Sequence, residues 1–297
     1  MAIGSSGSIA ISSSDDTKSP SSVQVDGDEV KAGDTTGDKK EDQKKSDKDT
    51  DESLEEQVVL DENGVKITVK GLDKDGSIFG PEVKLLIENE SGKDVTVQAR
   101  NLSVNEYMVE DMFSADVVNG KKVNDGLTIM ESSLEKAGIS TIADIEFSFT
   151  VSEAHSFDSL FDSDIIKLKT SAADSYEYTF DDSGDVVYNE GGVKIVVKGL
   201  SDSDSIFGPG IIVYAENNSE KNVTVQVTDV SVNGFMTDPI FSADVAAGKH
   251  AIDSITFISN DLDENEINNV KDVELSFHIF NDYFGESIDT DTVKISF

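Results

Sequence analysis

An internal repeat constrains this chain of 297 residues more than any other feature. The segment Val65–Leu72 (VKITVKGL) recurs 128 positions later as Val193–Leu200 (VKIVVKGL). From Val65 to Phe149, 39 of 85 positions are identical at that offset without a gap, which is far more than chance self-similarity produces. The chain therefore carries two copies of one unit, each of about 110 residues, an ordinary size for a single domain.

The limits of the repeat divide the chain. Near its end the offset becomes 127, because Ile166–Leu168 matches Val293–Ile295. We predict four segments: an arm over 1–57, a first copy over 58–170, a linker over 171–185 and a second copy over 186–297.

Apolar residues recur with a period of two inside each copy. Val65, Ile67 and Val69 alternate with polar residues, as expected of half-buried strands. About seven such strands per copy, separated by turn residues, predict an antiparallel β-sandwich. One short helix is expected in each copy, over 132–137 and 260–267, with N-caps at the first residue of each range. The predicted fold class is all-β, with two tandem immunoglobulin-like sandwiches preceded by a disordered acidic arm.

Three motifs carry a resemblance to a known group of domains. The first copy reads VKLLIENESGKDVTVQ, then FSADVVNGKK, then DIEFSF. This pattern resembles immunoglobulin-like modules of unknown function in lipoproteins and secreted proteins of Gram-positive gut bacteria. The resemblance covers both copies and neither the arm nor the linker. It implies an extracellular or cell-envelope setting, although no N-terminal Cys is present to carry a lipid.

The arm differs from the copies in composition. It has no aromatic residue, since the first in the chain is Phe79. Its Asp, Glu, Lys, Ser, Gly and Thr residues bury too little apolar surface to offset ordering entropy, so we predict a solvated, disordered stalk. The residues Ser8-Ile9-Ala10 resemble the end of a signal-peptide cleavage site. We hypothesise that the arm begins with the remnant of an export signal, so that the protein is secreted or envelope-associated.

The charge balance excludes several kinds of partner. The chain has 24 basic and 60 acidic residues, a formal net charge of −36. Such a chain is a poor ligand for nucleic acid or anionic lipid, because phosphate contacts need clustered Lys or Arg. No apolar run approaches the ~18 residues of a membrane span. The expected partner is an unknown protein or glycan, and self-repulsion favours a monomer.

Signatures of catalysis are sparse. The chain has no Cys and no Trp, which excludes disulfides, thiolate metal sites and a cysteine nucleophile. The three His residues do not occupy matching repeat positions, and no nucleophile elbow, Walker loop or zinc-protease motif is present. We predict a protein that is not an enzyme, with a hydrolase as the less favoured reading and no catalytic residue assigned.

Calcium is the main chemical alternative. Several loops place oxygen ligands on alternate residues, an arrangement that lets oxygens converge on a hard cation. The candidates are Asp73, Asp75, Asp202, Asp204, Asp261, Asp263 and Asn265. None completes a helix-loop-helix calcium pattern, and the Asp residues of the first copy align with Ser in the second. Solvated turn carboxylates are therefore the preferred interpretation and a calcium-stabilised extracellular module the alternative.

The loop Ser-Ile-Phe-Gly-Pro is the best-preserved loop between the copies, at 77–81 and 205–209. The structural interpretation is that each Phe plugs the end of a sandwich while Gly-Pro fixes the bend. The functional interpretation is an aromatic side chain presented to a partner. The weak partner-binding candidates are Phe79, Pro81, Phe207 and Pro209. The leading hypothesis is a non-enzymatic protein that presents two sandwiches for binding, adhesion or spacing.

Overall fold

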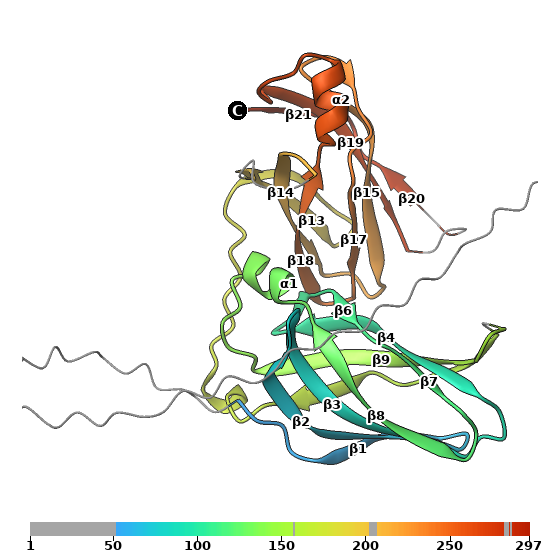
Figure 1. Ribbon diagram of the computed structural model, residues 1–297. Helices are drawn as coiled ribbons and strands as arrows, with labels where there is room; N and C mark the ends of the chain where they lie inside the picture. Colours follow the sequence, from blue (N-terminus) through green and yellow to red (C-terminus); the bar gives the residue numbers. More distant parts are fainter. Residues whose placement is uncertain (1–51, 157, 202–206, 282–284, 286) are drawn as a thin grey trace, which may run out of the picture. The chain divides into compact units, whose positions relative to one another are not determined.

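The computed structural model describes residues 52–156, 158–201, 207–281, 285 and 287–297, and these belong to one compact unit. The described chain is mostly β-strand, arranged in several antiparallel sheets (Figure 1). This confirms the predicted all-β class. The predicted disorder of the arm, up to residue 51, concerns residues outside those described.

The first copy supplies eleven strands and one helix. Alternating buried and exposed residues give strands such as Gly80–Asn89 their two faces. The strands are β1 (Gln57–Glu62), β2 (Val65–Ser77), β3 (Gly80–Asn89), β4 (Val95–Val104), β5 (Tyr107–Met108), β6 (Asp111–Met112), β7 (Ser114–Val117), β8 (Lys121–Ile129), β9 (Asp144–Glu153), β10 (Ser159–Asp162) and β11 (Ile166–Lys169). The helix is α1 (Glu131–Lys136).

The second copy supplies ten described strands and one helix. Its strands are β12 (Asp185–Glu190), β13 (Val193–Leu200), β14 (Gly210–Asn217), β15 (Val223–Val232), β16 (Phe235–Met236), β17 (Ser242–Val245), β18 (Lys249–Thr256), β19 (Asp272–Phe280), β20 (Ser287–Asp289) and β21 (Val293–Ser296). The helix is α2 (Ser259–Glu264), and a short 3₁₀ turn, η1 (Ala173–Ser175), precedes this copy.

The strands form three sheets. One has the order β1-β2-β3-β8-β6, and another has the order β16-β15-β19-β20 with β17 and β21 attached. The third sheet has ten strands and runs through both copies in the order β10-β9-β4-β5-β18-β14-β13-β12, with β7 attached to β4 and β11 attached to β9. Its two parts meet where Tyr107 of β5 pairs with His250 of β18, the one parallel pairing among the described residues. The repeat did not predict this continuity.

Each copy has its own hydrophobic core. The first core contains buried side chains from Leu54 to Leu168, and the second contains buried side chains from Val193 to Ile295. A third, small cluster contains Tyr107, Val196 and Tyr214, so it takes residues from both copies. The paired sheets around each core are β-sandwich-like, as the alternation of apolar residues indicates.

The two short helices begin one residue before the predicted ranges, and α2 ends at Glu264, three residues before its predicted end. Helix α1 begins at Glu131 with Met130 as N-cap, and α2 begins at Ser259 with Ile258 as N-cap. Neither N-cap side chain makes a capping hydrogen bond. The predicted caps were wrong because Ser132 already lies inside the helix, where Leu134 sets the register by packing into the core. No helix in the described part of the chain has the length and apolar character to cross a membrane.

The folded body begins before the predicted start of the first copy. Glu52 and Leu54, which we assigned to the arm, are 4% and 7% exposed. The Glu52 carboxylate accepts a hydrogen bond from the Ile142 backbone N–H at 3.0 Å and pairs with Lys74 at 3.1 Å. The arm therefore ends earlier than residue 57, because a buried carboxylate with two partners belongs to the body.

Candidate functional site: the junction between the copies

The junction is built on an apolar row of side chains on the second copy. Val196 pairs with Tyr214 across β13 and β14, and Tyr214 pairs with Ile252 across β14 and β18. Residues on either side of Val196 in the sequence point into the second core, so this row lies on the opposite face of the sheet. Val196 is 0% and Tyr214 1% exposed, which requires that other residues cover the row.

A hairpin of the first copy provides part of that cover. Strands β4 and β5 are joined at Asn105 and Glu106, and Tyr107 follows at 5% exposure. The Glu106 carbonyl accepts a hydrogen bond from the His250 backbone N–H at 2.9 Å. Met108, the next residue, packs against the second core. The hairpin thus contributes a side-chain anchor and a main-chain bond to the same contact.

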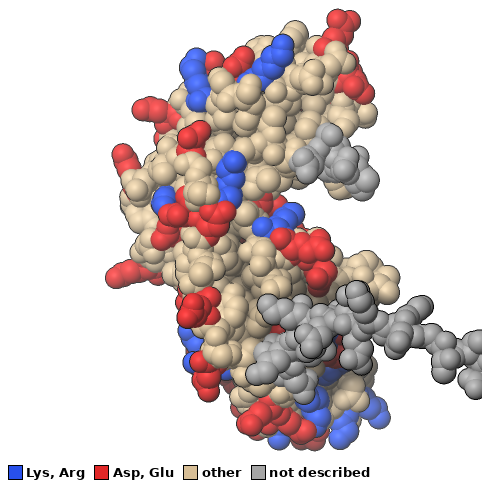
Figure 2. Space-filling view, turned by 90° about the vertical axis from the view of Figure 1, so that its left-hand side faces the viewer, with Lys and Arg blue, Asp and Glu red and all other residues tan. Residues whose placement is uncertain are grey.

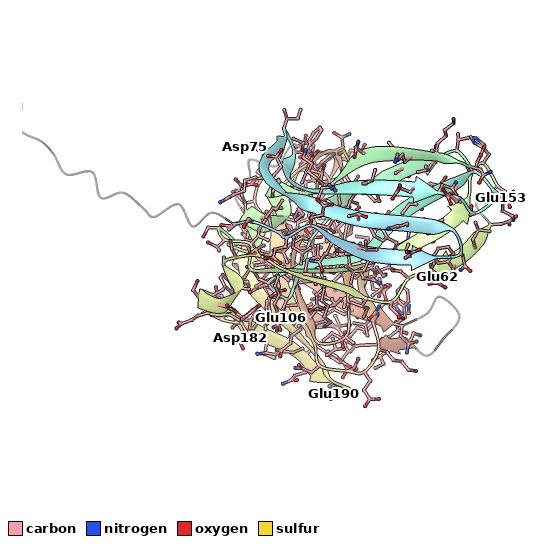
Figure 3. All side chains as sticks on the ribbon, turned by 90° about the horizontal axis from the view of Figure 1, so that it is seen from below. Glu62, Asp75, Glu106, Glu153, Asp182 and Glu190 are labelled. Carbon is pink, nitrogen blue, oxygen red and sulfur yellow. The ribbon has the colours of Figure 1, made fainter. Side chains whose placement is uncertain are left out.

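The linker supplies a second aromatic anchor. The Phe180 ring stacks on the His250 ring with centroids 3.9 Å apart, and it lies 5.6 Å from the Tyr107 ring. His250 also lies against Tyr214, with ring centroids 5.7 Å apart and the Tyr214 hydroxyl 2.6 Å from the His250 Nδ1. Figure 3 labels Glu106 and Asp182, which flank this cluster in the sequence, in the same region of the molecule. Four rings from three segments therefore seal the junction.

The linker does not pair as a strand. The residues from Tyr176 to Phe180 belong to no strand, although three of the five are aromatic. Instead the Tyr178 hydroxyl donates a hydrogen bond to the Asp144 carboxylate. Burial and that carboxylate raise the pKa of Tyr178. The linker is thus fixed by its side chains.

Burial controls the protonation of His250. The imidazole is 8% exposed, and this desolvation lowers its pKa; Glu216 opposes the effect and Lys249 adds to it. Burial therefore favours the neutral ring, which stacks on Phe180 with its Nδ1 2.6 Å from the Tyr214 hydroxyl. Because the pKa of His250 is lower in the folded chain than in the unfolded chain, the contribution of the neutral ring to folding stability is fully present above the unfolded pKa of about 6.5. It is lost as the pH falls through the folded pKa.

Ion pairs surround the aromatic cluster. The Glu146 carboxylate of β9 lies 3.1 Å from Lys249 of the second copy and 3.1 Å from Lys167. Burial raises the pKa of Glu146, but the two ammonium groups outweigh it and leave the pKa below its ordinary value. Lys136 of α1 lies 2.7 Å from Asp253 of β18. Charges of opposite sign thus meet across the junction.

A small cleft of about 220 Å³ lies beside these contacts. Its lining includes Met108, Asp111, Lys136, Asp244 and Asp253. Burial raises the pKa of Asp111 to about 6, with Arg100 opposing and a backbone hydrogen bond from Phe113 also opposing. Among the described residues no group of three or more His, Cys, Asp or Glu is placed to hold a metal ion.

The predicted Ser-Ile-Phe-Gly-Pro loops lie elsewhere, at the ends of strands. Gly80 has φ +148°, and a Cβ there would lie 2.1 Å from the Ile129 carbonyl oxygen. Gly208 has the same constraint against Phe257. These backbone contacts explain why Gly is kept in both copies. Figure 3 shows Asp75, near the end of β2 just before this loop, at the opposite end of the first copy from Glu62 and Glu153.

The aromatic side chains of these loops do not plug the sandwiches. Phe79 is 46% and Phe207 59% exposed, so the plug interpretation was wrong. The main chain makes the loop's contacts instead: the Phe79 carbonyl accepts from Glu131 at 2.8 Å, which leaves the ring outside. Pro81 is buried and Pro209 half-buried, which makes them parts of the bend.

The calcium candidates are scattered. Asp73 accepts a hydrogen bond from the Asp75 backbone N–H at 3.2 Å and pairs with Lys84 at 3.4 Å. Asp261 and Asp263 belong to α2, which Asn265 caps. The other two candidates, Asp202 and Asp204, lie outside the described residues. The calcium alternative stays a prediction.

Surface charge does not single out a site. Figure 2 shows one face, on which Asp and Glu side chains are spread, with Lys and Arg between them, and form no single patch. The junction is therefore the most elaborately built feature of the described chain. Sequence reasoning missed it, although a signal existed: Thr68, Leu86 and Asn124 of the first copy align with Val196, Tyr214 and Ile252.

Comparisons with known proteins add no family. No protein-family model matches the chain, and no curated protein matches it. Among solved structures, a crystal structure of the YadV chaperone matches with 15% sequence identity and a TM-score of 0.25. The match covers 72% of this chain and 92% of the chaperone chain. A TM-score this low carries no argument about fold or function.

Proposed function

We propose that this chain is a non-enzymatic, secreted or cell-envelope protein with two tandem immunoglobulin-like sandwiches. The contacts between the sandwiches hold them in one fixed relative orientation, and the pair serves for binding and spacing. The observation that carries the proposal is the sealed junction. The rings of Tyr107 and Phe180 pack against His250 across it, and a main-chain hydrogen bond and two ion pairs also cross it. A flexible tether between independent modules needs none of these contacts, whereas a spacer of defined geometry needs all of them.

The exposed loops supply the binding element of the proposal. Phe79 and Phe207 present aromatic rings from loops whose carbonyls accept hydrogen bonds from the first residues of α1 and α2. A rigid aromatic side chain offers a large contact area at low cost in conformational entropy. Two such loops at fixed separation bind a repetitive protein or glycan surface more tightly than either loop alone. The envelope setting is supported by the resemblance to modules of Gram-positive gut bacteria.

The geometry is tested by residual dipolar couplings measured on the full chain in weakly aligning medium. We expect the two copies to share one alignment tensor, and we expect Phe180→Ser to give each copy its own. Two independent tensors in the wild-type chain would overturn the fixed-spacer proposal.

The binding element is tested with the immobilised full chain. Glycan arrays and purified Gram-positive cell walls are the probes, and Phe79→Ser/Phe207→Ser is compared with the surface control Ile165→Ser. We expect the loop variant to lose retention and the control to keep it. Equal retention by both variants would contradict the role of the loops, and product release from the probes would contradict the non-enzymatic assignment.

A further inference from the structure

The second copy contains the counterpart of the hairpin that docks at the junction. In the first copy this hairpin joins β4 to β5 and carries Tyr107; in the second it joins β15 to β16 and carries Phe235 at the equivalent position. Tyr107 is 5% exposed and Phe235 is 48% exposed. Met236, which corresponds to Met108, is 68% exposed.

The two hairpins are held by the same hydrogen bonds. The Asn105 side chain donates to the Thr141 carbonyl at 2.7 Å and accepts from the Ala143 N–H at 2.8 Å. Asn233 donates to the Asn269 carbonyl at 2.8 Å and accepts from the Lys271 N–H at 2.9 Å. The difference in exposure therefore does not come from a different hairpin conformation. It comes from the presence of a neighbouring sheet face at the first hairpin.

The main chain repeats the same relation. In the first hairpin the Glu106 carbonyl accepts the His250 N–H at 2.9 Å. The equivalent residue in the second hairpin is Gly234, to whose carbonyl no described residue donates. An aromatic ring, a thioether and an available carbonyl thus stand together on a preformed turn, which are the three elements that the first hairpin uses.

We propose that the hairpin of Phe235 and Met236 is a docking element for the outer sheet face of another β-sandwich module. That face carries an apolar row like Val196, Tyr214 and Ile252, with an unpaired backbone N–H beside it. The proposal goes beyond the binding role of the Phe79 and Phe207 loops, because it uses a different surface.

The face that would bind Phe235 needs fewer kinds of chemical group than the face that binds Tyr107 within this chain. Tyr107 has a hydroxyl and Phe235 has none. A face that seats Phe235 therefore needs no polar group to pair with a hydroxyl. The first copy of a second chain does not fit, because the equivalent of its row contains Asn124, which is exposed, and Lys122 stands in place of His250. The second copy of another chain fits but is already covered by its own Tyr107 hairpin.

Displacement of the Tyr107 hairpin would uncover a face that fits Phe235. In the full chain, Tyr107→Asp places a charge in a seat that is 5% exposed, so the hairpin leaves and the face of β13, β14 and β18 becomes open. Each variant chain then has one open face and one Phe235 hairpin. The hairpin of one chain can bind the open face of the next, so the chains associate head to tail into growing assemblies. We expect sedimentation velocity at roughly 0.1 mM to show dimers and larger species.

Two matched variants make the result specific. Tyr107→Asp/Phe235→Asp keeps the open face but lacks the docking ring, and we expect it to remain monomeric. Wild-type chain added to Tyr107→Asp has a hairpin but no open face, so it should cap the assemblies and shorten them, whereas Phe235→Asp chain should not. Association of the double variant to the same extent, or no effect of capping, would overturn the proposal.

Opening of the face is checked by hydrogen exchange at the His250 amide, which loses its acceptor when the hairpin leaves. Where that amide stays protected, Glu106→Pro is added, because Glu106 has φ +68° and proline cannot adopt it. A chain whose His250 amide exchanges and that still sediments as a monomer at roughly 0.1 mM would also overturn the proposal.

Discussion

The outer sheet faces of the two copies are equivalent in backbone and different in chemistry. In the second copy the cross-strand row is Val196, Tyr214 and Ile252; in the first it is Thr68, Leu86 and Asn124. The row in the second copy is covered by a hairpin and by the linker, whereas Asn124 in the row of the first copy is exposed. In the first copy Thr68 is buried, Leu86 is half-buried and only Asn124 of the three is exposed. The same strands therefore form a contact surface between the copies in one case and a partly solvated surface in the other.

The docking hairpins show the opposite asymmetry. The first copy buries its hairpin aromatic and the second exposes it, although both turns are tied by an equivalent Asn. A duplicated module has two complementary surfaces per copy, here the outer sheet face and the hairpin, and joining two copies uses one surface of each. The two surfaces left over are the sheet face of the first copy and the hairpin of the second. A few side chains on the same backbone decide whether each of them can bind a further module.

The largest expected effect comes from a substitution in the cross-strand row of the second copy, compared with the equivalent substitution in the first. Tyr214→Ala removes a fully buried ring and should lower the free energy of unfolding by about 3–4 kcal/mol. The equivalent change Leu86→Ala removes a half-buried side chain and should cost about 1–2 kcal/mol. Urea denaturation followed by circular dichroism measures both. Equal losses would mean that the junction adds nothing to the stability of the second copy.

A second pair of variants tests where the copies are alike. Asn89 and Asn217 are both 0% exposed. Each donates to two backbone carbonyls, at 2.7–2.8 Å, and accepts from a Ser two residues later. Changing either to Ala leaves buried carbonyls unpaired, so each variant should lose about 2 kcal/mol.

The outcome to look for is equality between those two Asn variants. The exposed Asn119→Ala, which removes one acceptor for the Gly92 N–H, serves as the control and should lose well under 1 kcal/mol. A clear difference between the two buried Asn variants would show that the copies are not energetically equivalent in their shared turn.

Much of the fold could be predicted from the sequence because period and repeat report on it directly. Alternation at Val65, Ile67 and Val69 requires one buried face, and the structure has all three at 0% exposure. The helix starts could not be predicted from capping residues, because tertiary packing of Leu134 and Leu262 set them. The start of the body was missed because Glu52 has the composition of the arm and gains its partners only in the fold.

The junction could not be predicted for a different reason. A sequence repeat shows what two copies share, whereas the contact depends on what they do not share. Tyr214 reads as one more apolar strand residue until its register opposite Val196 and Ile252 is known. Likewise Phe79 reads as a core aromatic, but in the structure its carbonyl accepts a hydrogen bond from the Glu131 N–H and its ring is 46% exposed. Differences between aligned positions were the signal that sequence reasoning left unused.

A smaller effect concerns a carboxyl that the second copy lacks, since Asp111 aligns with Pro239. Burial raises the pKa of Asp111 to about 6, above the unfolded value of about 3.9. Its contribution to stability is therefore full below about pH 4 and is lost as the pH rises through about 6. Because the carboxyl is only half-buried, solvent screening reduces the cost of its charge to about 1 kcal/mol at pH 7.

Asp111→Asn tests this directly. The difference in free energy of unfolding between the variant and the wild-type chain should grow in the variant's favour between about pH 4 and 6 and stay constant above about 7. Denaturation curves at five pH values measure it. A difference that is independent of pH would show that Asp111 is as well solvated as an ordinary surface carboxyl.

The smallest expected effect is that of calcium, for which the comparison between the copies predicts none. A cation site inherited with the module would occupy the same register in both copies, yet Asp73 and Asp75 align with Ser201 and Ser203. In the first copy the Asp73 carboxylate is already engaged by Lys84 and by the Asp75 N–H. Millimolar calcium should therefore leave the melting temperature unchanged, because only a ligand that binds the native state raises it.

A rise in the melting temperature of the wild-type chain would revive the calcium alternative, and two variants would then locate the bound ion. Loss of the rise in Asp73→Asn/Asp75→Asn would place the ion in the first copy. Loss of the rise in Asp202→Asn/Asp204→Asn would place it in the second, which would make calcium a further property on which the two copies have diverged.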